Sequence, residues 1–164
     1  MIYEPIGPYV LQFPPYQGKS MEELMFEDYS YVASLPKRIF DKKYQMKDST
    51  KLAILRHATW LLQQGGRVGP SLYCVSCMKR AATCLIVPMM NLEYFIWKAA
   101  ERKCEECAQE TYMDKKHLVS LRFSTFLLLN TKGDKEEFAV ILRKVYQIKK
   151  SDPYLLFKFF QSMT

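Results

Sequence analysis

The sequence contains no long run of apolar residues. Its uninterrupted apolar stretches are short, such as residues 126–129, whereas a membrane-spanning helix needs about 18 or more such residues. We therefore expect no membrane partner. The first residues also lack the basic and apolar regions of a secretory signal. We expect the protein to remain in a reducing, cytoplasmic compartment.

Histidine is also scarce, with two in 164 residues. His57 lies beside an apolar helical stripe, where a packed or surface role is expected. We find, at recognisable spacing, neither paired acids that would converge on a metal nor a nucleophile with its base, and no H-x-E segment ahead of P-C-x-x-C as in zinc deaminases. Residues 65–70, GGRVGP, match neither the phosphate loop nor the dinucleotide fingerprint and are typical of a joint between two lobes. These absences predict a protein that is not an enzyme.

Four of the five cysteines form two Cys-x-x-Cys pairs: Cys74 with Cys77, and Cys104 with Cys107, with 26 residues between the pairs. Two residues between cysteines let one tight turn aim both sulfurs at the same ion, and two such turns complete the tetrahedral shell that Zn²⁺ prefers. A disulfide framework needs an oxidising compartment, and a redox motif needs one such pair rather than two. We therefore predict a structural zinc site. The fifth cysteine, Cys84, is expected to be a small buried side chain.

Positive charge is concentrated in one part of the chain. The formal net charge is +7, but residues 1–36 carry five acids and one lysine, whereas residues 37–56 carry seven basic residues and two acids. Aromatic residues interleave with these bases, as on surfaces that neutralise a phosphate backbone and stack on bases. A solvated helix face with its aromatics turned inward is the alternative. The candidate nucleic-acid-binding residues are Tyr16, Lys19, Lys37, Arg38, Lys42, Lys43, Tyr44 and Lys47, with Arg67, Lys79 and Arg80 as an extension.

The first half of the chain predicts one short strand followed by helices. Residues 9–13 alternate in polarity, and two prolines end this strand. Ser20 and Glu23 form a capping-box pattern, so a helix is expected to begin at Met21. A second helix spans residues 29–40 and is broken near Pro36, and a third spans residues 49–64 and is ended by the following glycines.

The second half predicts a zinc-ribbon-like lobe and then two helices. Strands are expected near residues 83–87 and 94–97, and Asp134 is the expected N-cap of a helix reaching residue 149. Pro153 begins a last helix that is apolar nearly all round and must dock on its own core or on a partner chain. The fold class is therefore α+β, with an N-terminal lobe at 1–66, a zinc-binding lobe at 67–130 and a C-terminal helical pair at 131–164 that packs back on the core.

Residues 13–31 contain a distinctive set: Phe13, Tyr16, Gly18, Lys19, Ser20, Glu23, Leu24, Asp28 and Tyr31. This set resembles the C-terminal module of exonuclease X-like proteins, in which a strand ends in phenylalanine, a Gly-Lys-Tyr-Lys-Gly-Lys turn follows, and a helix leads to an Asp-Pro-x-Tyr segment. Pro14, Pro15, Gln17 and Tyr29 depart from that pattern, so two of the three basic residues are absent. The resemblance covers under a quarter of the chain. It implies an accessory module without nuclease chemistry, in which Lys19 contacts nucleic acid and Tyr16 offers a stacking surface.

These observations lead to one main hypothesis and two alternatives. The main hypothesis is a zinc-stabilised, non-catalytic accessory protein that holds DNA or RNA through its basic residues. The first alternative is a protein-interaction subunit or inhibitor, of a kind that viruses and mobile elements encode, which docks on a larger protein or nucleoprotein complex, or on a second copy, through residues 153–164. The second is a zinc-dependent enzyme, which would lose turnover, but not its fold, on substitution of Cys104.

Overall fold

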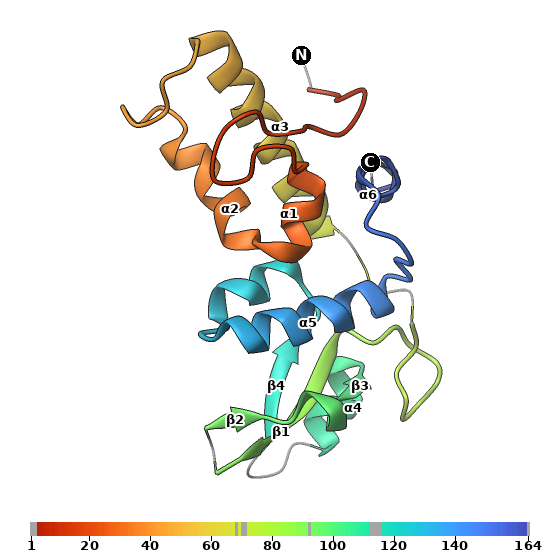
Figure 1. Cartoon of the computed structure of the whole chain (residues 1–164). Helices are drawn as coiled ribbons and strands as arrows, with labels where there is room; N and C mark the ends of the chain where they lie inside the picture. Colours follow the sequence, from red (N-terminus) through yellow and green to blue (C-terminus); the bar gives the residue numbers. More distant parts are fainter. Residues whose placement is uncertain (1–2, 68, 70–71, 92, 112–115, 164) are drawn as a thin grey trace. The chain divides into compact units, whose positions relative to one another are not determined.

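The computed structural model describes residues 3–67, 69, 72–91, 93–111 and 116–163 (Figure 1). The architecture is α+β, as predicted, and the chain forms two compact units. Unit 1 comprises Met1–Val68 and Lys150–Thr164, and unit 2 comprises Gly69–Lys149. The joint falls in the glycine-containing segment singled out from the sequence. The expected C-terminal helical pair is divided, because its first helix belongs to unit 2 and its second to unit 1.

Unit 1 begins with an irregular segment in place of the predicted strand at residues 9–13. A single bridge joins Val10 to Ser20, and the backbone N–H of Leu11 donates to the carbonyl of Lys19 at 2.8 Å. The chain must reverse direction within the few residues between these partners, and Gly18 allows the reversal because it adopts a φ of 85°. The strand prediction was wrong because the partner segment ends at Ser20 and a helix begins at Met21, so the pairing does not extend into a longer ladder.

The first helix, α1 (Met21–Glu27), begins with the predicted capping box. The Ser20 hydroxyl accepts from the Glu23 backbone N–H at 3.2 Å, and the Glu23 carboxylate accepts from the Ser20 N–H at 2.8 Å. Helix α2 (Tyr29–Arg38) follows, with Asp28 as its N-cap. Pro36 lies inside α2 and does not break it. The proline removes only the hydrogen bond of its own nitrogen, and the helix still closes after it, because the Ile39 N–H donates to the Leu35 carbonyl at 3.0 Å.

The long helix α3 (Asp48–Arg67) continues through Gly65 and Gly66, where the sequence predicted its end. Its buried face includes Ile54, Ala58 and Leu61, whereas Leu52 is 39% exposed. Gly65 is itself buried on this face, so the helix gains packing in its last turn that offsets the low helix propensity of glycine.

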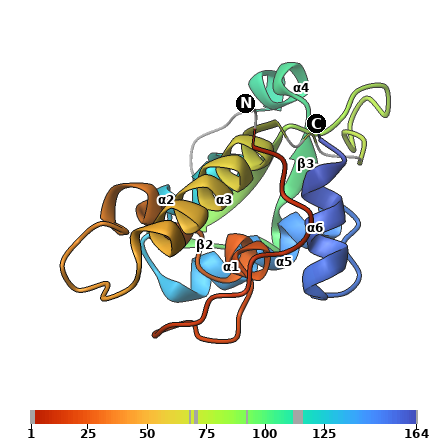
Figure 2. The ribbon, with the colours of Figure 1, turned by 90° about the horizontal axis from the view of Figure 1, so that it is seen from above.

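The C-terminal helix α6 (Pro153–Gln161) packs within unit 1, alongside α1 and α3 (Figure 2). Leu156, Phe157 and Phe160 are its buried residues, and the ring centroids of Phe157 and Trp60 are 5.7 Å apart. Asp152 caps this helix by accepting from the Leu155 N–H at 2.9 Å. The sequence left two docking surfaces open for this helix, its own core or a partner chain. In the structure its three buried residues pack on the core of unit 1.

Unit 2 contains a small antiparallel sheet with β1 (Cys84–Met90) at its centre. Strand β1 pairs with β3 (Glu101–Lys103) on one side and with β4 (Lys116–Ser120) on the other, and its end pairs with β2 (Tyr94–Phe95). Cys84 is in register with both Lys103 and Ser120. The sheet therefore fixes the residue that precedes the second cysteine pair.

Helices complete unit 2: the short 3₁₀ helices η1 (Trp97–Ala99) and η2 (Phe123–Leu128), α4 (Glu105–Thr111) and α5 (Lys132–Val145). The N-cap of α5 is Thr131 rather than the predicted Asp134. Asp134 occupies the third position, where its N–H donates to the Thr131 hydroxyl at 3.0 Å and its carboxylate accepts from the Trp97 indole at 2.8 Å. The Thr131 hydroxyl also donates to the Asp134 carboxylate at 2.7 Å, so Thr131 and Asp134 form the cap as a local pair.

The helices that the structure describes include none of the length and apolarity that a membrane crossing requires.

Candidate metal centre

The first cysteine pair lies in a tight turn of unit 2. The backbone N–H of Cys74 donates to the carbonyl of Arg80 at 2.8 Å, and the N–H of Met78 donates to the carbonyl of Cys74 at 3.0 Å. Met78 closes the turn with a φ of 54°. The turn has the tight form that the two-residue spacing predicts, and it places the Cys74 and Cys77 sulfurs on one side.

The second pair lies at the junction between a strand and a helix. Cys104 directly follows β3, and Cys107 is in the first turn of α4. The N–H of Val75 donates to the carbonyl of Arg102 at 3.0 Å, which ties the first turn to β3. The backbone thereby holds the two pairs against each other.

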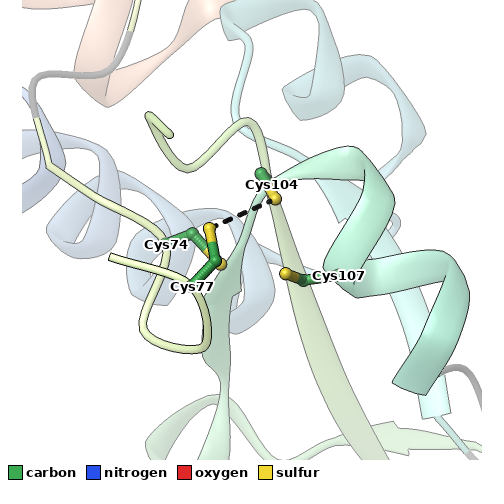
Figure 3. Close-up of side chains that lie close together, drawn as sticks. All are labelled: Cys74, Cys77, Cys104 and Cys107. Carbon is green, nitrogen blue, oxygen red and sulfur yellow. Dashed lines mark hydrogen bonds between the residues drawn. The ribbon is translucent and has the colours of Figure 1, made fainter. Parts of the chain in front are cut away.

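All four predicted ligands come together (Figure 3). Their sulfur atoms lie within 4.8 Å of one another, and those of Cys77 and Cys104 are 3.9 Å apart. A tetrahedral ion with metal–sulfur bonds of about 2.3 Å separates its sulfurs by about 3.8 Å. The four cysteines could therefore hold a metal ion with little rearrangement.

Backbone amides make the site suited to thiolates. Burial alone would raise the pKa of Cys74, but backbone N–H groups of Cys77, Cys104 and Ser76 outweigh it and lower the pKa to about 6. The N–H groups of Lys79 and Arg80 likewise lower the pKa of Cys77. A hydrogen bond with the Cys104 thiol raises the pKa of Cys107 to about 12. Without a cation the four sulfurs share protons, and a bound cation would replace them.

Two cationic side chains surround the cysteines. Lys103 is buried, and its amine donates to the Ser76 hydroxyl and lies 3.2 Å from the Glu101 carboxylate. Arg80, beside the first turn, forms an ion pair with Glu106 of α4. A four-thiolate shell around a dication carries about two negative charges, so a buried cation next to it is favourable.

The fifth cysteine stands outside the cluster, as predicted. Cys84 is buried with Ile86 and Ala108, and its thiol donates to the carbonyl of Lys103 at 3.3 Å. Burial raises its pKa. Cys84 is therefore a packed thiol rather than a ligand.

The residues of unit 1 that were predicted to bind nucleic acid fall into groups. Lys37, Arg38, Lys42, Lys43 and Lys47 lie at the end of α2 and in the loop after it, and we call them, together with Lys51 at the start of α3, the basic segment. The other group is engaged within its own unit, because Lys19 pairs with Glu27 and the Tyr16 hydroxyl donates to Asp28 at 2.5 Å. Arg67 ends α3 in unit 1, whereas Lys79 and Arg80 belong to unit 2.

Two further features were not found from the sequence. His57 and Glu22 form a buried pair, with 2.7 Å between Nε2 and Oε1. Arg56 and Gln64 line a cavity beside α3. The pair joins residues distant in sequence, so no local pattern indicates it. The sequence did contain a pattern that could have indicated the cavity, because Arg56, Gln63 and Arg67 recur at helical spacing on one face.

Comparisons of the chain with protein-family models, with curated proteins and with solved structures found no match.

Proposed function

We propose that the protein is a zinc-stabilised, non-catalytic nucleic-acid-binding protein. Zinc is the proposed metal because four thiolates in a tetrahedral arrangement are its usual structural site. An iron centre uses the same ligands, so elemental analysis of the purified protein distinguishes them. Four cysteine ligands fill the shell and leave no open position for a substrate or an activated water molecule. The metal therefore serves the fold of unit 2 and not a reaction.

The basic segment carries the proposal for nucleic acid. Its side chains are exposed, apart from the half-buried Lys51. Within the part of the chain that the structure describes, Arg38 alone among them forms an ion pair, with Asp41 at 3.8 Å. An ion pair this long and exposed contributes little. The cations therefore remain available for phosphate groups.

Aromatic rings accompany these cations. Phe40 is 52% exposed, and the amine of Lys51 lies 5.9 Å from its ring centroid. Tyr44 is half-buried against Phe13, with 5.6 Å between ring centroids, and the Lys43 amine lies 4.8 Å from the Tyr44 ring. Exposed rings between cations are the composition of surfaces that bind single strands by stacking and charge. Phe40 thus joins the proposed interface, whereas Tyr16 and Lys19 leave it.

Fluorescence anisotropy with labelled DNA and RNA oligonucleotides tests this function. If all six cations contact phosphates, the logarithm of the single-strand affinity should fall with the logarithm of salt concentration with a slope of about −4. The double variant Lys42→Glu, Lys43→Glu should weaken binding strongly, because it replaces two attractive charges with repulsive ones.

The matched control is Lys149→Glu, Lys150→Glu, which reverses two adjacent exposed lysines outside the basic segment. This control should bind nearly as well as the wild type. Equal losses in the two double variants would show that net charge rather than the basic segment drives binding. Absence of binding at low salt would overturn the proposal.

Protein binding is a second candidate function, favoured by one observation in unit 2. Exposed apolar side chains of Met90, Tyr94, Ile96 and Val140 border a cavity of about 520 Å³ between β2, η1 and α5. Exposed apolar patches often mark interaction sites. If copies of the chain associate through this patch, Val140→Lys should shift the mass measured by light scattering from a dimer to a monomer. An unchanged mass would exclude self-association through the patch.

A further inference from the structure

Unit 1 contains a cavity of about 670 Å³ beside α3. One side is formed by α3, and the other by the N-terminal residues Tyr3 and Glu4. The cavity lies in the size range of small-ligand sites. Neither the metal centre nor the basic segment contributes to it.

Two arginines flank the cavity along α3. Arg56 and Arg67 are eleven residues apart on the same face, which corresponds to about three turns, or about 16 Å, along the helix axis. Across the described ranges neither guanidinium has an acidic partner within ion-pair distance, and Glu4 is the one acid in the lining. A ligand that satisfies both arginines must be elongated and must carry anionic groups at separated positions.

Amide side chains lie between the arginines. Gln63 and Gln64 both line the cavity. Gln64 is 3% exposed, and its Oε1 atom is buried without a hydrogen-bond partner in the part of the chain that is described. A buried acceptor without a partner is uncommon and costs stability. A ligand with an N–H group, and a small rotation of the amide, would satisfy it.

The opposite wall is held in place by buried groups. The Tyr3 hydroxyl lies 3.2 Å from Nδ1 of His57, whose Nε2 lies 2.7 Å from the Glu22 carboxylate. His57 and Glu22 are both buried. The Tyr3 ring is therefore fixed beside the cavity before any ligand arrives, as a preformed stacking surface requires.

We propose that this cavity receives one unpaired nucleotide of a single-stranded nucleic acid. The inference rests on the nucleic-acid-binding function proposed above and specifies its ligand. The base would stack on Tyr3 and present its edge to Gln63 and Gln64, and Arg56 and Arg67 would contact phosphates further along the strand on its two sides. A base within a duplex is paired and stacked, so it cannot enter such a cavity without being unpaired first.

The test compares a labelled single strand with the duplex that it forms with its complement. The wild type should bind the single strand about tenfold more tightly, the free energy typical of stacking one base. Arg56→Ala and Arg67→Ala should each lower the single-strand affinity severalfold and reduce or abolish the preference. The matched control is Arg122→Ala, which removes the same charge from an exposed site in unit 2, and it should retain the preference.

Each outcome separates this inference from the proposed function. Equal wild-type affinity for single strand and duplex would overturn the cavity site but leave the basic segment standing. The cavity site would also be overturned, and the basic segment retained, if the double variant Lys42→Glu, Lys43→Glu loses binding while both arginine variants keep the single-strand preference. No binding of either ligand would overturn both proposals. Because Arg56 and Arg67 are exposed, their substitution should leave the circular dichroism spectrum and melting temperature unchanged, and Arg67→Lys should restore part of the preference.

Discussion

Nε2 of His57 lies 2.7 Å from Oε1 of Glu22, and neither side chain is more than 1% exposed. The pair connects α1 to α3. Glu22 also accepts from the backbone N–H of Tyr9 at 3.3 Å. The N-terminal segment, α1 and α3 are thus joined through one buried carboxylate.

Substitution of Glu22 by alanine should destabilise unit 1. Removal of one partner from a buried polar pair leaves the other without its hydrogen bond and typically costs about 3 kcal/mol or more. Trp60 can report the loss, because its ring centroid is 5.4 Å from that of His57. In a Trp97→Phe background, denaturant unfolding followed by Trp60 fluorescence measures the change. Glu22→Gln keeps the shape and one acceptor and should cost less, so equal losses in the two variants would contradict this role.

Lys103→Met should weaken retention of the metal. The Lys103 amine is buried and donates to Ser76, which lies between the first two cysteines. Loss of a group that supports metal ligands typically costs tenfold or more in metal affinity, so we expect release of the metal to be about tenfold faster. Release into a chromophoric chelator measures the rate. Lys98→Met removes an exposed lysine from the same unit and should release the metal at the wild-type rate. Equal rates in both variants would contradict a supporting role for Lys103.

The start of α1 and the cysteine cluster were predicted correctly because both depend on short local sequence patterns. The start of α1 was predicted because the capping box depends on four consecutive residues, Ser20 to Glu23. The metal cluster was predicted because each pair needs only one tight turn. The two cysteine pairs must also lie side by side, and the backbone hydrogen bond between Val75 and Arg102 brings them together.

Two errors have different causes. Gly65 would end α3 in isolation, but it is buried in the helix, so tertiary packing overrode the local preference. The cap predicted at Asp134 lost to a local competitor, because the Thr131 hydroxyl accepts from the Asp134 N–H and donates to the Asp134 carboxylate. The contact between Glu22 and His57 was not predicted at all, because its partners stand 35 residues apart and no local pattern indicates it.

Tyr16→Phe should destabilise unit 1 without weakening binding of nucleic acid. The Tyr16 hydroxyl donates to Asp28, whose carboxylate also caps α2 by accepting from the Tyr31 N–H at 3.1 Å. Loss of this hydrogen bond should cost about 1 kcal/mol. The bond to Asp28, with some burial, raises the pKa of Tyr16 to about 12. Its stabilising effect is therefore complete below about pH 10 and is lost as the pH rises through about 12.

Denaturant unfolding at neutral pH and oligonucleotide anisotropy measure the two effects of Tyr16→Phe separately. A large loss of affinity with normal stability would place Tyr16 in the interface, as the resemblance in the first 31 residues implies.

Gln64→Leu should stabilise unit 1. The substitution replaces a buried amide, whose Oε1 has no hydrogen-bond partner among the described residues, with an apolar group of similar size. Removal of an unsatisfied buried acceptor should raise the free energy of unfolding by about 1 kcal/mol. The same substitution should lower affinity for single strands if the cavity binds a base. Gln63→Leu changes an exposed neighbour and should leave stability nearly unchanged. A destabilised Gln64→Leu protein would show that the amide is needed for the fold.

Removal of the metal should unfold unit 2 and leave unit 1 folded. All four cysteines lie in unit 2, where they join the first turn to β3 and α4, and structural zinc sites of this kind supply much of the folding free energy of their lobe. The two tryptophans separate the responses, because Trp60 lies in unit 1 and Trp97 in unit 2. In the Trp60→Phe protein, a chelator should shift the Trp97 emission to that of a solvated indole, because the ring loses its burial and its hydrogen bond to Asp134. In the Trp97→Phe protein the Trp60 emission should not change.

Cys84→Ala, which removes the thiol outside the cluster, should still bind one metal ion per chain. A Trp60 response equal to that of Trp97, or loss of metal from Cys84→Ala, would contradict the assignment.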